Sequence, residues 1–72
     1  MQNIRPRIGA RIRELRLKRE WSQEEPADRA NLHRNFIGAV ERGEQNLSLA
    51  SLVKISKTLG VKLVDLVRGI DD

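Results

Sequence analysis

Apolar residues recur along this chain at intervals of three and four positions, and no segment alternates apolar and polar residues with a period of two. The first spacing is typical of amphipathic helices and the second of strands, so the pattern favours helices throughout. It predicts five of them with short connections, covering about 4–20, 22–30, 33–42, 49–59 and 62–69. The expected fold class is therefore all-α, a compact five-helix bundle.

Four of the predicted helices carry an apolar stripe that can face a common core. These stripes are Ile4, Ile8, Ile12 and Leu15; Phe36, Ile37 and Val40; Leu49, Leu52, Ile55 and Leu59; and Leu63, Leu66, Val67 and Ile70. Trp21 precedes the remaining helix and can pack back onto it. We expect Trp21 and Phe36 to be core residues rather than platforms for stacked bases, because both fall on inward faces.

Short polar residues and glycines mark the expected ends of the helices. Ser22-Gln-Glu-Glu25 has the form of a capping box, in which the Ser22 hydroxyl accepts a hydrogen bond from the first turn and Glu25 reaches back. Ser48 is the expected N-cap of the fourth helix. The residues expected to end helices are Asn31, which can adopt the left-handed conformation, Gly43 and Gly60.

The second and third helices are short and are joined by only Asn31-Leu32-His33. Two helices joined by so short a turn cross at a steep angle, which is the helix-turn-helix geometry, here expected over about 22–42. Ala27 is small enough for the two helices to approach closely, and Leu32 fills the turn. The outer face of the third helix then presents Arg34, Asn35, Gly38, Ala39 and Arg42.

Length and composition limit the functions that are available. The chain has 72 residues, of which 39% are hydrophobic, so we expect one small domain over 1–72 with its core in about 5–69. It has one His and no Cys, which excludes disulfides and thiolate ligands and leaves no nucleophile–base pair. We therefore expect no catalytic residue, no metal site, no cofactor and no small-molecule ligand. The apolar runs are too short to cross a bilayer, so we expect no membrane partner.

The net charge is +4, and the positive charge is concentrated at the N-terminal end. Residues 1–20 contain seven basic and two acidic side chains. Such a balance suits a polyanion, with nucleic acid as the first candidate and an anionic membrane as the second. It is equally typical of a solvated helix face, and Arg13 and Arg19 are candidates for plain solvated side chains. Charge alone does not decide the function.

Seven short stretches between about Ile8 and Leu66 occur in an order and spacing that are typical of one family. They are Ile12-Arg-Glu-Leu-Arg16, Ser22-Gln-Glu-Glu25, Ala27, Leu32-His-Arg34, Ile37-Gly-Ala-Val-Glu-Arg-Gly43, Asn46-Leu-Ser-Leu49 and Leu59-Gly-Val61. Together they resemble the phage repressor and Cro family, also called the XRE family. Among its members the chain looks most like the compact stand-alone ones, such as restriction–modification controller proteins. The resemblance implies a lambda-repressor-like domain that binds DNA.

The resemblance also implies a role for each matching side chain. Arg34 and Asn35 would read base edges in the major groove, since Arg suits guanine O6 and N7 and Asn suits adenine N6 and N7. Gly38 and Ala39 would allow close approach, with the Ala39 methyl against a thymine methyl. His33 would either cap the third helix or touch phosphate or base. The residues that would contact the phosphate backbone are Ser22, Gln23, Arg42 and Asn46.

Five further positions are informative because they match or depart from the family pattern. Arg16 and Glu41 match positions that form a buried ion pair in many members, and the pair would tie the first helix to the end of the third. Pro26 stands where a large aliphatic residue is expected, Phe36 where Tyr is common and Asn31 where Gly is usual. In a helix that begins at the capping box, Pro26 would remove an amide bond, so either the helix starts later or this position carries strain.

The predicted function is that of a sequence-specific transcription regulator, a repressor or an activator, that binds a palindromic operator in double-stranded DNA as a homodimer. Two recognition helices about 34 Å apart would then read two half-sites. The expected dimer face is the stripe of Val64, Val67 and Ile70 on the last helix. The same stripe suits the alternative function, an antitoxin-like or adaptor module whose main partner is a protein surface. The expected location is the cytoplasm, in association with the nucleoid.

Overall fold

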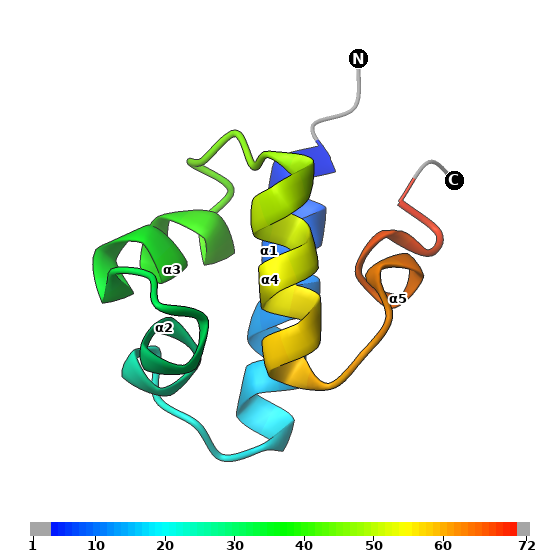
Figure 1. The fold of residues 1–72 in the computed structure, drawn as a ribbon. Helices are drawn as coiled ribbons and strands as arrows, with labels where there is room; N and C mark the ends of the chain where they lie inside the picture. The colour runs from blue at the N-terminus through cyan, green and yellow to red at the C-terminus, as the bar shows by residue number, and fades with distance from the viewer. Residues whose placement is uncertain (1–3, 71–72) are drawn as a thin grey trace.

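The computed structural model describes residues 4–70, so the predicted domain ends at 1–3 and 71–72 lie outside the described residues. It contains five α-helices and, within the described part, no strand, which confirms the predicted all-α bundle. The helices are α1 (Ile4–Lys18), α2 (Glu24–Ala30), α3 (Arg34–Glu41), α4 (Leu49–Leu59) and α5 (Leu63–Val67). The pair α2 and α3 lies on one side of the molecule and α5 on the opposite side (Figure 1). Helix α1 packs against α3 and α5, and α4 packs against α2 and α5.

Every helix contributes apolar side chains to one core. Ile12 and Ile37 are almost inaccessible to solvent, as is Leu66 from α5. The buried cluster consists of Ile8, Ile12, Ala27, Ile37, Val40, Ile55, Leu59, Leu66 and Ile70. Trp21 and Phe36 are half-buried and pack against this cluster, so their predicted place in the core is confirmed.

The predicted apolar stripes are wrong at their outer positions. Ile4 is 47% exposed and Leu49 is 67% exposed, although both were expected to face the core. Each is the first residue of its helix, so its side chain projects beyond the packed middle of the bundle. Val67, the last residue of α5, is also exposed. The helical period identifies which face is apolar, but it does not show how far along the helix the core extends.

Helices α1 and α3 approach each other backbone to backbone at Gly9. A Cβ atom at this position would lie 2.3 Å from the Val40 carbonyl oxygen and 2.6 Å from that of Glu41. Both distances are far below van der Waals contact, and both atoms belong to the main chain, which cannot rotate away. Gly9 therefore sets the distance between α1 and the end of α3.

Most of the predicted helix ends are confirmed. The Ser48 hydroxyl accepts a hydrogen bond from the amide of Ser51 at 3.1 Å, as expected for the N-cap of α4. Asn31 adopts the left-handed conformation at the end of α2, with φ of 56°. The glycines that were expected to end α3 and α4 are also left-handed, with φ of 77° for Gly43 and 71° for Gly60.

The predicted capping box at Ser22 is wrong, because α2 begins at Glu24 and Gln23 occupies the N-cap position without a side-chain cap. Pro26 is therefore the third residue of the helix, where a backbone amide has no helical acceptor in any case. In a helix capped by Ser22, the Ser22 carbonyl would have accepted from an amide at position 26; here it accepts from the amide of Glu25 at 3.3 Å. The late helix start thus removes the strain that the sequence suggested.

The C-terminal segment is held by two arginines of α1, Arg7 and Arg11, which we call the arginine clamp. Arg11 donates to the carbonyl of Asp65 at 2.7 Å and to that of Arg68 at 3.0 Å. Arg7 donates to the carbonyl of Gly69 at 2.9 Å and also to that of Ile70. These are carbonyls that a short helix and the turns after it leave without helical donors, so the clamp fixes α5 against α1.

Candidate nucleic-acid interface

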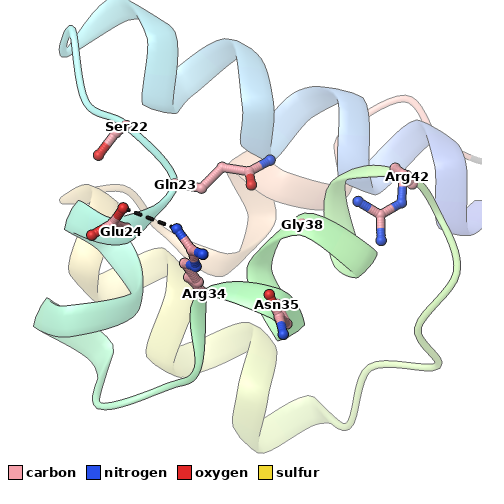
Figure 2. Close-up of a pocket in the computed structure, with 7 residues that line it drawn as sticks. All are labelled: Ser22, Gln23, Glu24, Arg34, Asn35, Gly38 and Arg42. Carbon is pink, nitrogen blue, oxygen red and sulfur yellow. Dashed lines mark hydrogen bonds and ion pairs between the residues drawn. The ribbon is translucent and has the colours of Figure 1, made fainter.

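The helix-turn-helix builds one polar face around the start of α3. Its side chains line an open pocket of about 350 Å³ (Figure 2). We call this surface the recognition face, and its residues are Ser22, Gln23, Glu24, Arg34, Asn35, Gly38 and Arg42. Six of the seven were predicted as site residues from the sequence. The seventh, Glu24, was not predicted.

Three other residues that were predicted to contact DNA do not line this pocket. His33 is the N-cap of α3, and its Nδ1 accepts a hydrogen bond from the amide of Asn35 at 3.1 Å, which confirms the capping role. Ala39 is half-buried. Asn46 lies in the loop before α4 and lines a separate small pocket beside Ile4 and Ile8. The structure thus places Asn46 near the start of α1 and away from the recognition face.

Gly38 was expected on the outer face of α3, but it is buried. The cover comes from the protein itself, because the Gln23 and Arg42 side chains converge above it. A Cβ atom at Gly38 would lie 3.2 Å from Nη1 of Arg42 and 3.2 Å from Oε1 of Gln23. The glycine therefore makes room for the two side chains that were predicted to bind phosphate.

The predicted ion pair between Arg16 and Glu41 is confirmed. Arg16 Nε lies 2.7 Å from Oε2 of Glu41, and Nη2 lies 2.8 Å from Oε1, with side-chain exposures of 8% and 3%. Arg16 Nη1 donates to the carbonyl of Trp21 at 2.8 Å, and Gln23 Nε2 donates to Oε1 of Glu41 at 3.2 Å. The hydrogen bond to Glu41 and the carboxylate's charge raise the pKa of Arg16, although burial alone would lower it. This buried network fixes Gln23 at the edge of the recognition face.

Both arginines of the recognition face are paired with exposed carboxylates. Nη1 of Arg34 lies 3.2 Å from Oε1 of Glu24, and Nε of Arg42 lies 3.1 Å from Oε1 of Glu44. All four side chains are about 60% exposed. Exposed pairs of this kind contribute only about 0–1 kcal/mol, so the loss of either pair changes DNA affinity by at most about fivefold.

Most of the arginines at the N-terminal end make hydrogen bonds or ion pairs within the protein. Besides the arginine clamp and Arg16, Arg19 donates to the carbonyl of Leu15 at 2.8 Å and to that of Leu59. The expectation that Arg19 is a plain solvated side chain is therefore wrong. Four of the seven basic residues in 1–20 hold the bundle together. Because these side chains are committed to contacts within the bundle, their number alone does not locate a surface for a polyanion.

The predicted dimer face is reduced to two residues. Val64 is 49% exposed and Val67 is 36% exposed. Ile70 is only 6% exposed and belongs to the core of its own chain, because the turn after α5 brings it back onto the bundle. Within residues 4–70, no helix combines the length and apolar character needed to cross a membrane.

Known proteins with a similar sequence or structure identify the family. The helix-turn-helix family matches residues 12–66. Control protein C.BamHI of Bacillus amyloliquefaciens is 48% identical over 65 residues, which are 89% of this chain and 80% of that protein. The restriction–modification controller protein C.AhdI of Aeromonas hydrophila has a similar crystal structure, with a TM-score of 0.82 and 36% identity over 88% of this chain and 94% of that one.

A second solved structure is that of the controller protein C.Esp1396I, a tetramer in complex with its natural 35 base-pair operator. It has a TM-score of 0.82 and 30% identity, over 100% of this chain and 99% of that one. The family match covers most of the chain, and the similarity extends over 80% of C.BamHI, 94% of C.AhdI and 99% of C.Esp1396I. The chain therefore belongs to the helix-turn-helix family, of the XRE type that includes the restriction–modification controller proteins.

Proposed function

We propose that this protein is a transcription regulator that binds a palindromic operator in double-stranded DNA as a homodimer through the recognition face. The observation that carries the proposal is the pair Arg34 and Asn35, which stand exposed at the first turn of α3 and line the same pocket as Gln23 and Arg42 (Figure 2). The function is regulatory rather than enzymatic, as in the controller proteins to which the chain is similar.

The arrangement divides the work between base reading and backbone binding. Arg34 presents a planar set of donors that suits guanine O6 and N7, and Asn35 presents a donor and an acceptor that suit adenine. Ser22, Gln23 and Arg42 line the same pocket and are our candidates for phosphate binding, which fixes the register but carries no sequence information. At the margin of the face, Ala39 and the free Nε2 of His33 are further candidates for base contacts, and Asn46 for a more distant phosphate.

The homodimer completes the site, because one recognition helix covers only one half-site. Two copies related by a twofold axis read two half-sites about 34 Å apart. The similar protein C.Esp1396I binds its operator as a tetramer, which supports assembly of this kind. Val64 and Val67 of α5 are the exposed apolar pair that we assign to the dimer face. A regulator of this type acts in the cytoplasm, at the nucleoid.

The direct test is selection of bound duplexes from a random DNA library with the purified protein. We expect the selected sequences to converge on an inverted repeat whose two halves lie one helical turn apart. Native mass spectrometry with the selected duplex then counts two protein chains for each inverted repeat. A library that does not converge would instead favour the alternative, a module whose partner is another protein.

The first prediction separates the two classes of contact. Arg34→Ala should lower affinity for the selected operator by about 1–3 kcal/mol and relax the preference at one base position in each half-site. Arg42→Ala should weaken binding to operator and random DNA by similar factors and reduce the slope of log affinity against log salt by about one. Both are measured by titration of labelled duplexes at several salt concentrations. Equal losses of Arg34→Ala on operator and random DNA would contradict the assignment.

The second prediction concerns the dimer face. Val67→Asp should give monomers in sedimentation velocity and much weaker operator binding with an unchanged helical circular dichroism spectrum, because a carboxylate would be buried between two copies. Leu49→Asp is the control, since it introduces the same charge at a more exposed apolar position on α4 and should leave the dimer intact. The opposite result for the two variants would place the interface on α4.

A further inference from the structure

The recognition face contains one acidic side chain, Glu24, directly beside the arginine that we assign to base reading (Figure 2). Glu24 is the first residue of α2, and its Oε1 contacts Nη1 of Arg34 at 3.2 Å. Both side chains are 64% exposed, so neither is needed for the core. A carboxylate on a surface that binds DNA repels phosphate on every sequence. Glu24 therefore cannot raise the overall affinity for DNA, and we look for its effect on the choice between sequences.

The geometry of the pair leaves Arg34 able to bind a base. A guanidinium carries five donors in a planar fork, and Glu24 engages one nitrogen of the fork. Among the described residues, no second carboxylate contacts Arg34. The remaining donors suffice for the two parallel hydrogen bonds that guanine O6 and N7 accept. Arg34 can therefore contact guanine and Glu24 together.

Contact with phosphate is different in this respect. The Arg34 side chain is long and flexible, and on DNA without a guanine at the right position its favourable alternative is a backbone phosphate. A phosphate bound by Arg34 would bring a second negative charge next to the Glu24 carboxylate, whereas the guanine edge is uncharged. Binding to the wrong sequence then gains a repulsion that binding to guanine does not.

We propose that Glu24 is a positioning residue for sequence recognition, which holds Arg34 toward the bases and penalises its use as a phosphate contact. This inference rests on the proposed function and adds to it a residue that directs Arg34 toward bases in preference to phosphates. Glu24 is expected to lower affinity for random DNA more than it lowers affinity for the operator.

The neighbouring residue provides a matched control. Glu25 also lies in the first turn of α2 and also pairs with an arginine, with Oε2 2.8 Å from Nε of Arg29. Arg29 stands over the ring of Trp21, 4.6 Å from its centroid, and does not line the recognition face. Glu24→Gln and Glu25→Gln therefore remove the same charge, with the same change of shape, from adjacent positions. Only the first change releases Arg34.

The experiment measures dissociation constants for the selected operator and for random duplex of equal length, at one salt concentration. For Glu24→Gln we expect the ratio of the two constants to fall about three- to fivefold, mainly through tighter binding to random DNA. For Glu25→Gln we expect both constants to change by the same factor, so that the ratio is kept. Circular dichroism melting of both variants checks that the fold is unchanged.

A double-mutant cycle tests whether Glu24 acts through Arg34. In an Arg34→Ala background, Glu24→Gln should leave the remaining ratio unchanged, as Glu25→Gln does. A fall that persists without Arg34 would show that Glu24 contacts the bases itself and would overturn the positioning role. If the parent discriminates the operator but Glu24→Gln and Glu25→Gln behave alike, the inference alone fails. A parent that discriminates no sequence would overturn the proposed function instead.

Discussion

Replacement of Glu41 by Leu is expected to lower the free energy of unfolding by about 3–5 kcal/mol, because it leaves the buried Arg16 guanidinium without its carboxylate. Both hydrogen bonds between the two side chains are lost, and the Gln23 amide loses its acceptor as well. In a domain of this size about 1 kcal/mol moves the thermal midpoint by roughly 4–8 °C. The midpoint should therefore fall by more than about 12 °C in circular dichroism melting at fixed protein concentration.

The double variant Arg16→Met with Glu41→Leu is the control for this expectation. An apolar pair of similar volume in place of a buried ion pair is often neutral or stabilising, so the double variant should melt well above the single one. A single variant that melts near the parent would show that the pair is not desolvated in solution. The raised pKa of Arg16 means that its contribution is complete below the unfolded arginine pKa and is lost only as pH rises past the folded value. We therefore expect no effect of Arg16 titration at neutral pH.

Gly9→Ala is expected to destabilise the protein by about 3 kcal/mol or more, at the upper end of overpacking effects. The added methyl group would meet two main-chain carbonyl oxygens of α3, and only a separation of α1 from α3 can relieve the contact. That separation would also stretch the Arg16–Glu41 pair, which joins the same two helices. Urea unfolding followed by circular dichroism measures the loss.

The sign of this change makes it a strict test. In an unconstrained helix interior, Gly→Ala stabilises by roughly 0.8–1 kcal/mol through helix propensity alone. The neighbouring change Ala10→Gly, at an exposed position of α1, should destabilise the protein by about the same amount, because it exchanges the same two residues in the opposite direction. A Gly9→Ala variant that is as stable as the parent would mean that α1 and α3 do not approach as closely as described.

Local signals predicted the parts of the fold that depend on local structure. Ser48 and Gly60 delimit α4 as expected, since each needs only its own hydroxyl or its own freedom at positive φ. Ser22 failed as a cap where side chains of other helices fix both of its neighbours: Arg16 of α1 donates to the Trp21 carbonyl, and Glu41 of α3 accepts from the Gln23 side-chain amide. A capping pattern is reliable only where nothing distant competes for the same segment.

In the candidate site too, local signals predicted some residues, and a tertiary contact that they could not predict adds another. The helical period placed Arg34 and Asn35 on the outer face of α3, where the structure has them exposed. It could not reveal Glu24, because the contact joins residues in two helices whose crossing angle is a tertiary property. A carboxylate ten positions before a predicted base-reading arginine, at the start of the preceding helix, is nevertheless a signal that can be sought in related sequences.

The arginine clamp has a consequence for the order in which the chain folds. Its hydrogen bonds join residues that are 54 to 63 positions apart, so nearly the whole chain must be closed into a loop before they can form. Helix α5 has five residues, too few to be stable alone in water, and therefore docks only after α1 and its partners are in place. The apolar pair Val64 and Val67 is presented only at that last step. In the dimer proposed above, a partly folded chain would therefore lack the surface for self-association, and copies would meet through α5 only after each had completed its own bundle.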